Sequence, residues 1–272
     1  MTEPKSVRRG AAMATTVALC VAALSATPTV AQAGEPDVVT APVVAEALAG
    51  VDGSLIAAPS DDSGVGATEL GGGTVEVPAR PDSGVTLAAP DGSELTIGLP
   101  AADEAENAST LADGTIVYPA EDVSNAIIVS DIGVQMLSTI VDSAAPTSFE
   151  YDLSLEPDQS LKLIDGGAVV TDADGTVAVV VADAWAVDAK GDPVPTRYEV
   201  AGSTLIQHVD HTSETVAYPV VADPFWLAPW VVRCLIGIGL NGPQIARIAS
   251  AGSPGALAAA FGYGALRCVL GR

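Results

Sequence analysis

The sequence predicts a mainly β fold, an antiparallel sandwich or barrel-like sheet, followed by a small C-terminal α-helical subdomain. Short stretches of alternating apolar and polar residues recur from Thr74 onward, separated by turns that contain Gly and Asp. No long amphipathic helix lies between these stretches, which argues against a parallel α/β fold. Beyond Pro224 the alternation ends, and apolar stretches with helix start and stop signals follow.

The predicted strands follow from this alternation over residues 74–223, which we expect to form the β-rich domain. Turn sequences separate them, as at Pro90-Asp91-Gly92-Ser93. Neighbouring strands at this spacing favour antiparallel pairing. The predicted strands cover residues 74–77, 84–88, 94–99, 115–118, 126–129, 133–141, 148–155, 161–164, 168–171, 176–181, 196–200, 204–209 and 215–221.

Residues 1–33 are predicted to be a secretory signal peptide. A basic segment over 5–9 precedes an Ala-, Val- and Leu-rich stretch over 10–26, and Ala31-Gln32-Ala33 predicts cleavage after Ala33. The apolar stretch is shorter than the ~20 residues that span a bilayer, which favours a cleaved signal over an anchor. General secretory and twin-arginine export both stay open. We therefore expect a secreted, extracellular protein.

Residues 34–73 are expected to be an acidic, flexible, linker-like region. Ala, Asp, Pro and Gly dominate it, and the part over 61–73 contains Asp-Asp-Ser-Gly and Gly-Gly-Gly. One short helix is expected over 42–49, where apolar side chains share a face.

The charge distribution divides the chain at Pro224. Residues 34–223 contain 33 Asp and Glu against four Lys and Arg, whereas the last 49 residues contain four Arg and no acid. A surface this anionic argues against nucleic acid, whose phosphates it would repel. The tail and its junction supply the candidate interaction residues, namely Phe225, Trp226, Trp230, Arg233, Arg247 and Arg267. The simpler interpretation of the aromatic residues is a plug that packs helices onto the sheet.

Cys234 and Cys268 are expected to form a disulfide that closes the tail, residues 224–272. Cys20 would leave with the signal peptide, so two cysteines remain in an oxidising compartment. The bond would contribute about 3–4 kcal/mol in the chain-entropy model. Three short helices are expected in the tail, over 230–240, 244–251 and 254–269.

The stretch from Trp185 to Pro224 resembles a module found in uncharacterised secreted actinobacterial proteins. It contains, in order, WAVDAKG, VPTRYEV, GSTLIQHV and AYPVVADP. In those proteins the module ends at VADP, and an aromatic residue and a variable C-terminal piece follow. The resemblance covers about residues 148–226. It implies a β-rich module followed by a variable tail, and it implies no activity and no site residue.

No pattern of chemically reactive residues points to a particular reaction. His208 and His211 do not predict a metal site, because residues three apart on a strand face opposite sides. Neither lies in a setting typical of a catalytic triad, and Gly-x-Ser-x-Gly is absent from the sequence. Several acids in Gly-containing loops suit weak calcium binding, although polar hairpin turns explain them more simply; they are Asp172, Asp174, Asp183, Asp188 and Asp192. No metal or cofactor is expected.

The expected function is that of a secreted, non-enzymatic protein that binds an unknown partner outside the cell or at the cell envelope. One alternative is an acidic precursor or carrier of a cationic, bacteriocin-like C-terminal peptide, whose partner would be a membrane surface. Another alternative is an exported hydrolase, which would need a pocket of convergent acids.

Overall fold

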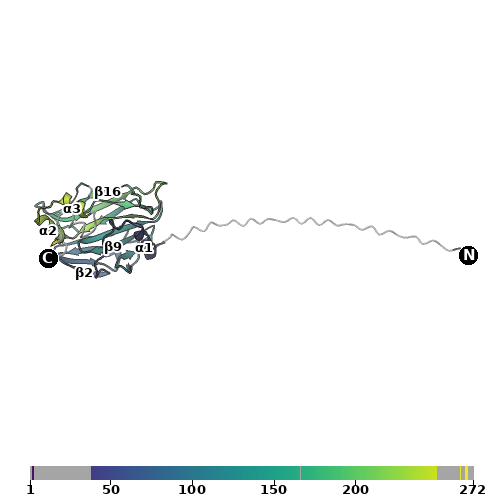
Figure 1. Cartoon of the computed structure of the whole chain (residues 1–272), viewed down its shortest axis with the longest axis horizontal. Helices are drawn as coiled ribbons and strands as arrows, with labels where there is room; N and C mark the ends of the chain where they lie inside the picture. The colour runs from purple at the N-terminus through teal and green to yellow at the C-terminus, as the bar shows by residue number, and fades with distance from the viewer. Residues whose placement is uncertain (1, 3–37, 166, 250–263, 265–266, 269–272) are drawn as a thin grey trace. The chain divides into compact units, whose positions relative to one another are not determined.

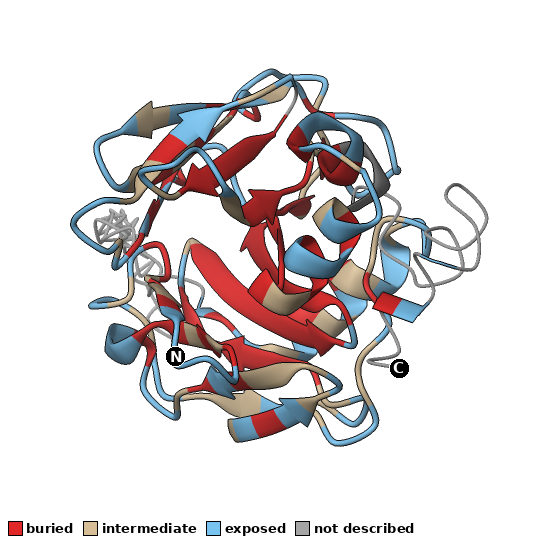
Figure 2. Cartoon of the chain, turned by 90° about the vertical axis from the view of Figure 1, so that its left-hand side faces the viewer, coloured by how far each residue is buried: buried red, intermediate tan, exposed pale blue. Residues whose placement is uncertain are grey.

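Strands β9 (Val123–Ser130) and β10 (Gly133–Ile140) form the centre of the fold and are buried along their whole length. The computed structural model describes residues 2, 38–165, 167–249, 264, 267 and 268 (Figure 1). Buried residues concentrate in these central strands (Figure 2). Strands that are buried on both faces need covering layers on both sides.

The central strands belong to a ten-stranded antiparallel sheet. Its main path runs β12-β13-β14-β19-β10-β9-β7-β6, and β18 pairs with both β10 and β15. The remaining strands of this sheet are β6 (Ser109–Thr110), β7 (Ile116–Tyr118), β12 (Ser160–Leu163), β13 (Ala168–Thr171), β14 (Val177–Val181), β15 (Ala186–Val187), β18 (Val220–Ala222) and β19 (Phe225–Leu227).

Two smaller sheets pack on one face of the central sheet. Ile127 of β9 and Met136 of β10 share a hydrophobic cluster with Leu87 and Leu205, which come from the two smaller sheets. The four-stranded sheet contains β2 (Gly66–Leu70), β3 (Gly73–Val77), β4 (Val85–Ala88) and β5 (Glu94–Ile97), and the three-stranded sheet has the order β11 (Ser148–Asp152), β17 (Thr204–Val209) and β16 (Thr196–Ala201). A separate two-stranded pair joins β1 (Val38–Val39) to β8 (Ala120–Glu121).

Helices cover the opposite face. Ile128 and Leu137 alternate with the residues of the first cluster and pack in a second cluster with Val44, Val231 and Ile245. These three come from α1 (Ala41–Gly50), α2 (Pro229–Gly237) and α3 (Gly242–Ala249), respectively. The predicted fold class is therefore confirmed: a mainly antiparallel β, sandwich-like fold with a small C-terminal helical region.

The region over 34–73 differs from the predicted flexible linker. Helix α1 is present as expected, but β2 pairs with β3 and contributes the buried Thr68 to the core. The glycines near β3 have a packing role, because a Cβ at Gly72 or Gly73 would overlap the ring of Trp230. Glycine here permits close approach, which local sequence does not distinguish from flexibility.

The predicted boundary at Pro224 does not separate two structural units. Strand β19 lies directly after Pro224 and pairs with β10 on one side and β14 on the other. The described residues from Val38 onward belong to one compact unit. The apolar run after Pro224 is thus a central strand followed by α2.

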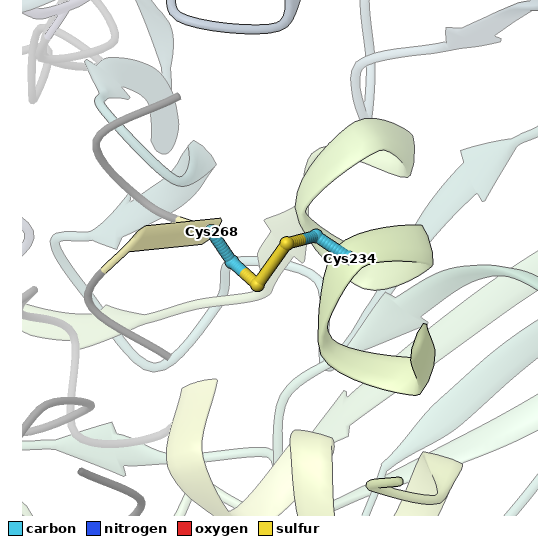
Figure 3. The surroundings of a disulfide bond; sticks show 2 residues. All are labelled: Cys234 and Cys268. Atoms are coloured by element: carbon cyan, nitrogen blue, oxygen red, sulfur yellow. A yellow bond between two sulfur atoms is a disulfide. The ribbon is translucent and has the colours of Figure 1, made fainter. Parts of the chain in front are cut away.

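The disulfide is formed as predicted. Cys234 lies on α2, its Cα is 5.4 Å from that of Cys268, and the bond joins the two segments of the tail (Figure 3). Residues 254–269 of the third predicted helix lie mostly outside the described residues, although Gly264, Arg267 and Cys268 are helical. The signal peptide, its cleavage after Ala33 and Cys20 also lie outside them. Among the helices of the described part, none is long and apolar enough to cross a membrane.

Candidate functional site

A row of polar side chains crosses the outer face of the three-stranded sheet. Along β17, Leu205, Gln207 and Val209 are buried, so the alternate residue His208 faces outward. Ser148 of β11 lies directly opposite His208 in the register. Glu199 of β16 is the diagonal neighbour of His208 on the other side. The pleat therefore brings three residues from three strands together.

Hydrogen bonds join these three side chains in a chain. Ser148 Oγ lies 2.9 Å from Nδ1 of His208, and Nε2 of the same ring lies 3.0 Å from Oε2 of Glu199. Because a carboxylate can only accept, Nε2 carries the hydrogen, and Nδ1 of the neutral ring is then free to accept the serine proton. The side chain of His208 is 21 % exposed and that of Glu199 is 58 % exposed, so solvent reaches the row.

An acidic pocket of about 230 Å³ adjoins Ser148, which lines it. Four carboxylate residues share the lining, and none of its described residues is Lys, Arg or His; the acids are Glu104, Glu121, Asp122 and Glu150. Concentrated negative charge in a concave site attracts ammonium and guanidinium groups. The pocket is therefore chemically suited to a cation.

Two residues of this pocket hold left-handed backbone conformations without being glycine. Ala101 has φ of 49° and Asp122 has φ of 57°. Backbone hydrogen bonds hold both, since Ala101 O accepts from Glu104 N–H and Asp122 O accepts from Val141 N–H. Strain of this kind, about 1–3 kcal/mol per residue, persists only where the surrounding structure enforces it. The pocket wall is thus fixed in shape.

The edge of β11 that faces away from β17 presents backbone donors. Leu153 N–H donates to Ser203 O on the β17 side, whereas Ser154 N–H donates to Thr96 O on the opposite side. Since N–H directions alternate along a strand, those of Ser148 and Glu150 also point to the edge opposite β17. Both residues line the acidic pocket, so this edge borders it.

The inner face of the same sheet contacts a buried polar network centred on Asp223. Its Oδ1 accepts the N–H of Trp185 at 2.9 Å, and Gln207 Nε2 donates to Trp185 O at 3.3 Å. Burial, and in addition the neighbouring Asp183 carboxylate, raise the pKa of Asp223 well above its usual range. Asp223 Oδ2 and the hydroxyl of Tyr198 have no hydrogen-bond partner among the described residues.

Asp188 and His211 also form hydrogen bonds with other residues of the fold. Burial acts to raise the pKa of Asp188, but hydrogen bonds from the N–H groups of Ala217, Lys190 and Asp192 outweigh it, and the pKa is lowered. His211 is buried, and its Nε2 donates to Pro146 O at 3.0 Å. Asp188 and His211 therefore bond to groups other than Ser148 and Glu199, the partners of the His208 ring.

The five acids considered for calcium binding lie in two kinds of environment, hairpin turns and the neighbourhood of the buried Asp223. Asp174 accepts the N–H of Thr176, and Asp172 O accepts from Gly175 N–H in the same hairpin turn. Asp188 closes a second turn through Asp192. Asp183 lies instead beside the buried Asp223. Four of these five acids therefore lie in polar hairpin turns, which was the simpler interpretation.

Two of the candidate interaction residues are in the core. Phe225 and Trp226 are 2 % and 0 % exposed, so neither forms a surface anchor. Phe225 packs in the cluster that contains residues of α2, whereas Trp226 lies in the cluster between the sheets, with its ring 6.1 Å from that of Tyr151. Trp230 is partly buried and packs against both hydrophobic clusters. The remaining candidates are the arginines of the tail.

Arg233 binds the turn between β4 and β5. Its guanidinium lies 2.6 Å from Asp91, and both side chains are exposed. The side chain and N–H of Ser93, followed by Arg233, lower the pKa of Asp91 to about 2. Arg267 is exposed on the tail, and the side chain of Arg247 lies outside the described part. The ion pair between Arg233 and Asp91 thus joins the cationic tail to the acidic body.

No protein-family model matches the sequence, and no curated protein matches it. Sequence reasoning missed Ser148 and Glu199 because no local motif contains them. The turn at Gly202 predicts the β16–β17 register and hence the closeness of Glu199 and His208. Ser148 is 60 residues from His208, and no local signal predicts that pairing.

Proposed function

We propose that this protein acts outside the cell or in the cell envelope as a binding protein, and that the pocket beside Ser148 receives a cationic group of its partner. The observation that carries the proposal is that four Asp and Glu residues line one pocket whose described lining contains no Lys, Arg or His. The predicted signal peptide and the Cys234–Cys268 disulfide support an oxidising compartment.

The chemistry of the pocket restricts the class of partner. The chain has a formal net charge of −23, so its field repels nucleic acids and other polyanions and attracts polycations. Long-range attraction would raise the association rate, while the fixed pocket wall would select a single ammonium or guanidinium group. A basic peptide, or a polymer that bears amines, fits both requirements.

Release of the C-terminal tail as a free peptide has less support. Its first residues form β19 between β10 and β14, and Trp226 is completely buried. Removing the tail would take a strand out of the central sheet and open the core. A carrier protein needs a cargo that can leave without unfolding the remainder.

Calorimetric titration of the mature protein with a short lysine-rich peptide tests the proposal. The double variant Asp122→Asn, Glu150→Gln removes two pocket charges, and the matched control Glu76→Gln, Glu94→Gln removes two exposed charges elsewhere. We expect about fivefold weaker binding for the pocket variant, because each partly exposed ion pair contributes about 0.2–1 kcal/mol. Equal weakening by both variants would show general surface attraction and overturn the pocket's role.

A further inference from the structure

The geometry points to a chemical activity beside the pocket: we propose that Ser148, His208 and Glu199 form a nucleophilic site that hydrolyses esters or amides whose acyl group carries a positive charge. The cationic preference rests on the proposed function of the pocket, whereas the reactivity of Ser148 does not. The proposal departs from the sequence-based expectation of a non-enzymatic protein.

The hydrogen-bond chain has the parts that activate a serine. A nucleophilic serine needs a base within hydrogen-bond distance and a third group that orients the base. Ser148 Oγ is 2.9 Å from His208 Nδ1, and Glu199 fixes the ring through Nε2 at 3.0 Å. Relative to the familiar triad the two ring nitrogens exchange roles, and such sites are recognised by geometry and role rather than by chain order.

The reaction proceeds by acyl transfer to the serine. As Ser148 Oγ attacks the carbonyl carbon, its proton passes to His208 Nδ1, and the C=O electron pair moves to the carbonyl oxygen. When the tetrahedral intermediate collapses, the bond to the leaving alcohol or amine breaks, and that group takes the proton from Nδ1. Water then attacks the acyl-serine in the same way, which releases the acid and restores Ser148.

Charge around the pocket explains why the acyl group must be cationic. The Glu199 carboxylate stabilises the imidazolium that forms on proton transfer. The N–H of Ser148 or that of Glu150, both on the outer edge of β11, can donate to the developing oxyanion; the two are about two strand residues apart, so one oxygen meets one of them. The pocket carboxylates oppose that oxyanion, so a substrate that brings its own positive charge neutralises them.

A purely structural role for the row predicts a different outcome. Polar pairs across neighbouring strands on a solvent-exposed face contribute about 0.2–1 kcal/mol each without any reactivity. In that case Ser148 would react like any other exposed serine. Covalent labelling distinguishes the two roles, because it reports nucleophilicity directly and needs no knowledge of the natural substrate.

The first test treats the mature, disulfide-intact protein with a small alkyl fluorophosphonate and locates the adduct by peptide mass spectrometry. We expect one adduct on Ser148, absent in Ser148→Ala and slowed about 100-fold in His208→Asn. Ser154→Ala is the control, since Ser154 is an exposed serine next to the end of β11 and outside the pocket lining, and its hydroxyl bonds to the backbone of Thr96 rather than to a histidine. Labelling of Ser148 no faster than of Ser154 overturns the proposal.

The second test compares hydrolysis of the p-nitrophenyl esters of Nα-acetyl-lysine and Nα-acetyl-norleucine, whose acyl groups differ in that only the first carries a positive charge. We expect the lysine ester to be cleaved at least about fivefold faster than the norleucine ester. We also expect Glu150→Gln to reduce this ratio of rates. Equal rates with labelled Ser148 would support the hydrolase and contradict the cationic pocket. Peptide binding without labelling would support the binding function and contradict the hydrolase.

The Ser148→Ala variant needs a folding control. If it unfolds at the same temperature as the wild-type protein, its loss of labelling is not caused by misfolding.

Discussion

The three-stranded sheet carries polar residues on both of its faces, and the two sets differ in burial. On the inner face Tyr198 and Gln207 are buried beside Asp223. One residue away along the same strands, Glu199 and His208 face solvent and bond to each other. The pleat thus separates groups whose burial determines stability from groups that remain free for chemistry. Changes to the inner face should alter the free energy of unfolding, and changes to the outer face should alter reactivity.

The largest effect is expected from Asp223→Ala. The substitution leaves the buried N–H of Trp185 without its acceptor and opens a cavity, so we expect a loss of about 3 kcal/mol in the free energy of unfolding. Glu199→Ala on the outer face should change it by less than about 0.5 kcal/mol. Urea denaturation of both variants measures the difference, and equal losses would contradict the division between the faces.

Asp223 should also make stability depend on pH. Its folded-state pKa is raised above the 3.8 of the unfolded chain, so its contribution is complete below pH 3.8 and declines as pH rises through the folded-state pKa. Asp223→Asn cannot ionise. The stability of this variant relative to wild type, measured by urea denaturation, should therefore rise as the pH is raised from about 4 to the folded-state pKa of Asp223.

Asp174→Asn is the control for this pH dependence. Hydrogen bonds from Thr176 lower the pKa of Asp174, so the contribution of Asp174 is lost only as pH falls below 3.8. Its relative stability should stay constant over the same range. A constant difference for Asp223→Asn as well would show that Asp223 is ionised in the folded protein.

Tyr198→Phe should be neutral or stabilising by up to about 1 kcal/mol. The Tyr198 hydroxyl is buried and has no hydrogen-bond partner among the described residues, so its removal relieves a desolvation penalty. The neighbouring Tyr151→Phe is a matched control, because its hydroxyl lies 3.5 Å from Ser138 Oγ. If Tyr198→Phe is the more destabilising of the two by thermal denaturation, the hydroxyl has a buried partner such as water.

The smallest stability effect is expected from His208→Asn. The ring bonds to exposed or half-buried partners, so we expect a change below about 0.5 kcal/mol in urea denaturation together with a large loss of Ser148 labelling. A loss above about 2 kcal/mol with unchanged labelling would assign the residue to the fold instead.

The alternation of apolar and polar residues predicted most strands, because one face of each strand packs against a core. This pattern did not predict β2 or β19, for different reasons. Gly71-Gly72-Gly73 resembles a linker, but two of these glycines admit the ring of Trp230. Phe225-Trp226-Leu227 is apolar on both faces because β19 lies inside the central sheet, and an uninterrupted apolar run has no period.

Residues of the WAVDAKG and AYPVVADP stretches take part in the buried network. Trp185 and Asp223 exchange hydrogen bonds across β15 and β18, and Asp188 binds the N–H of Ala217. These contacts hold the WAVDAKG and AYPVVADP stretches together in the fold. They could not be predicted, because each joins segments about 30 residues apart or more.

The candidate site was harder to predict than the fold. The sequence did not assign His208 a role, because its partner Ser148 depends on the register of β11, which no turn links to β17. The acids that line the pocket come from three segments far apart in the sequence, around Glu104, Glu121 and Glu150. In a chain with 34 acids, composition alone does not select the four that line it.

The relative labelling rate of Ser148 and Ser154 by a fluorophosphonate tests most directly whether the outer face of the sheet carries chemistry. A rate at least about 100-fold higher at Ser148, lost in His208→Asn while the fold stays intact, is the predicted result. Equal rates at the two serines would contradict it and leave Ser148, His208 and Glu199 as a structural row on an acidic binding protein.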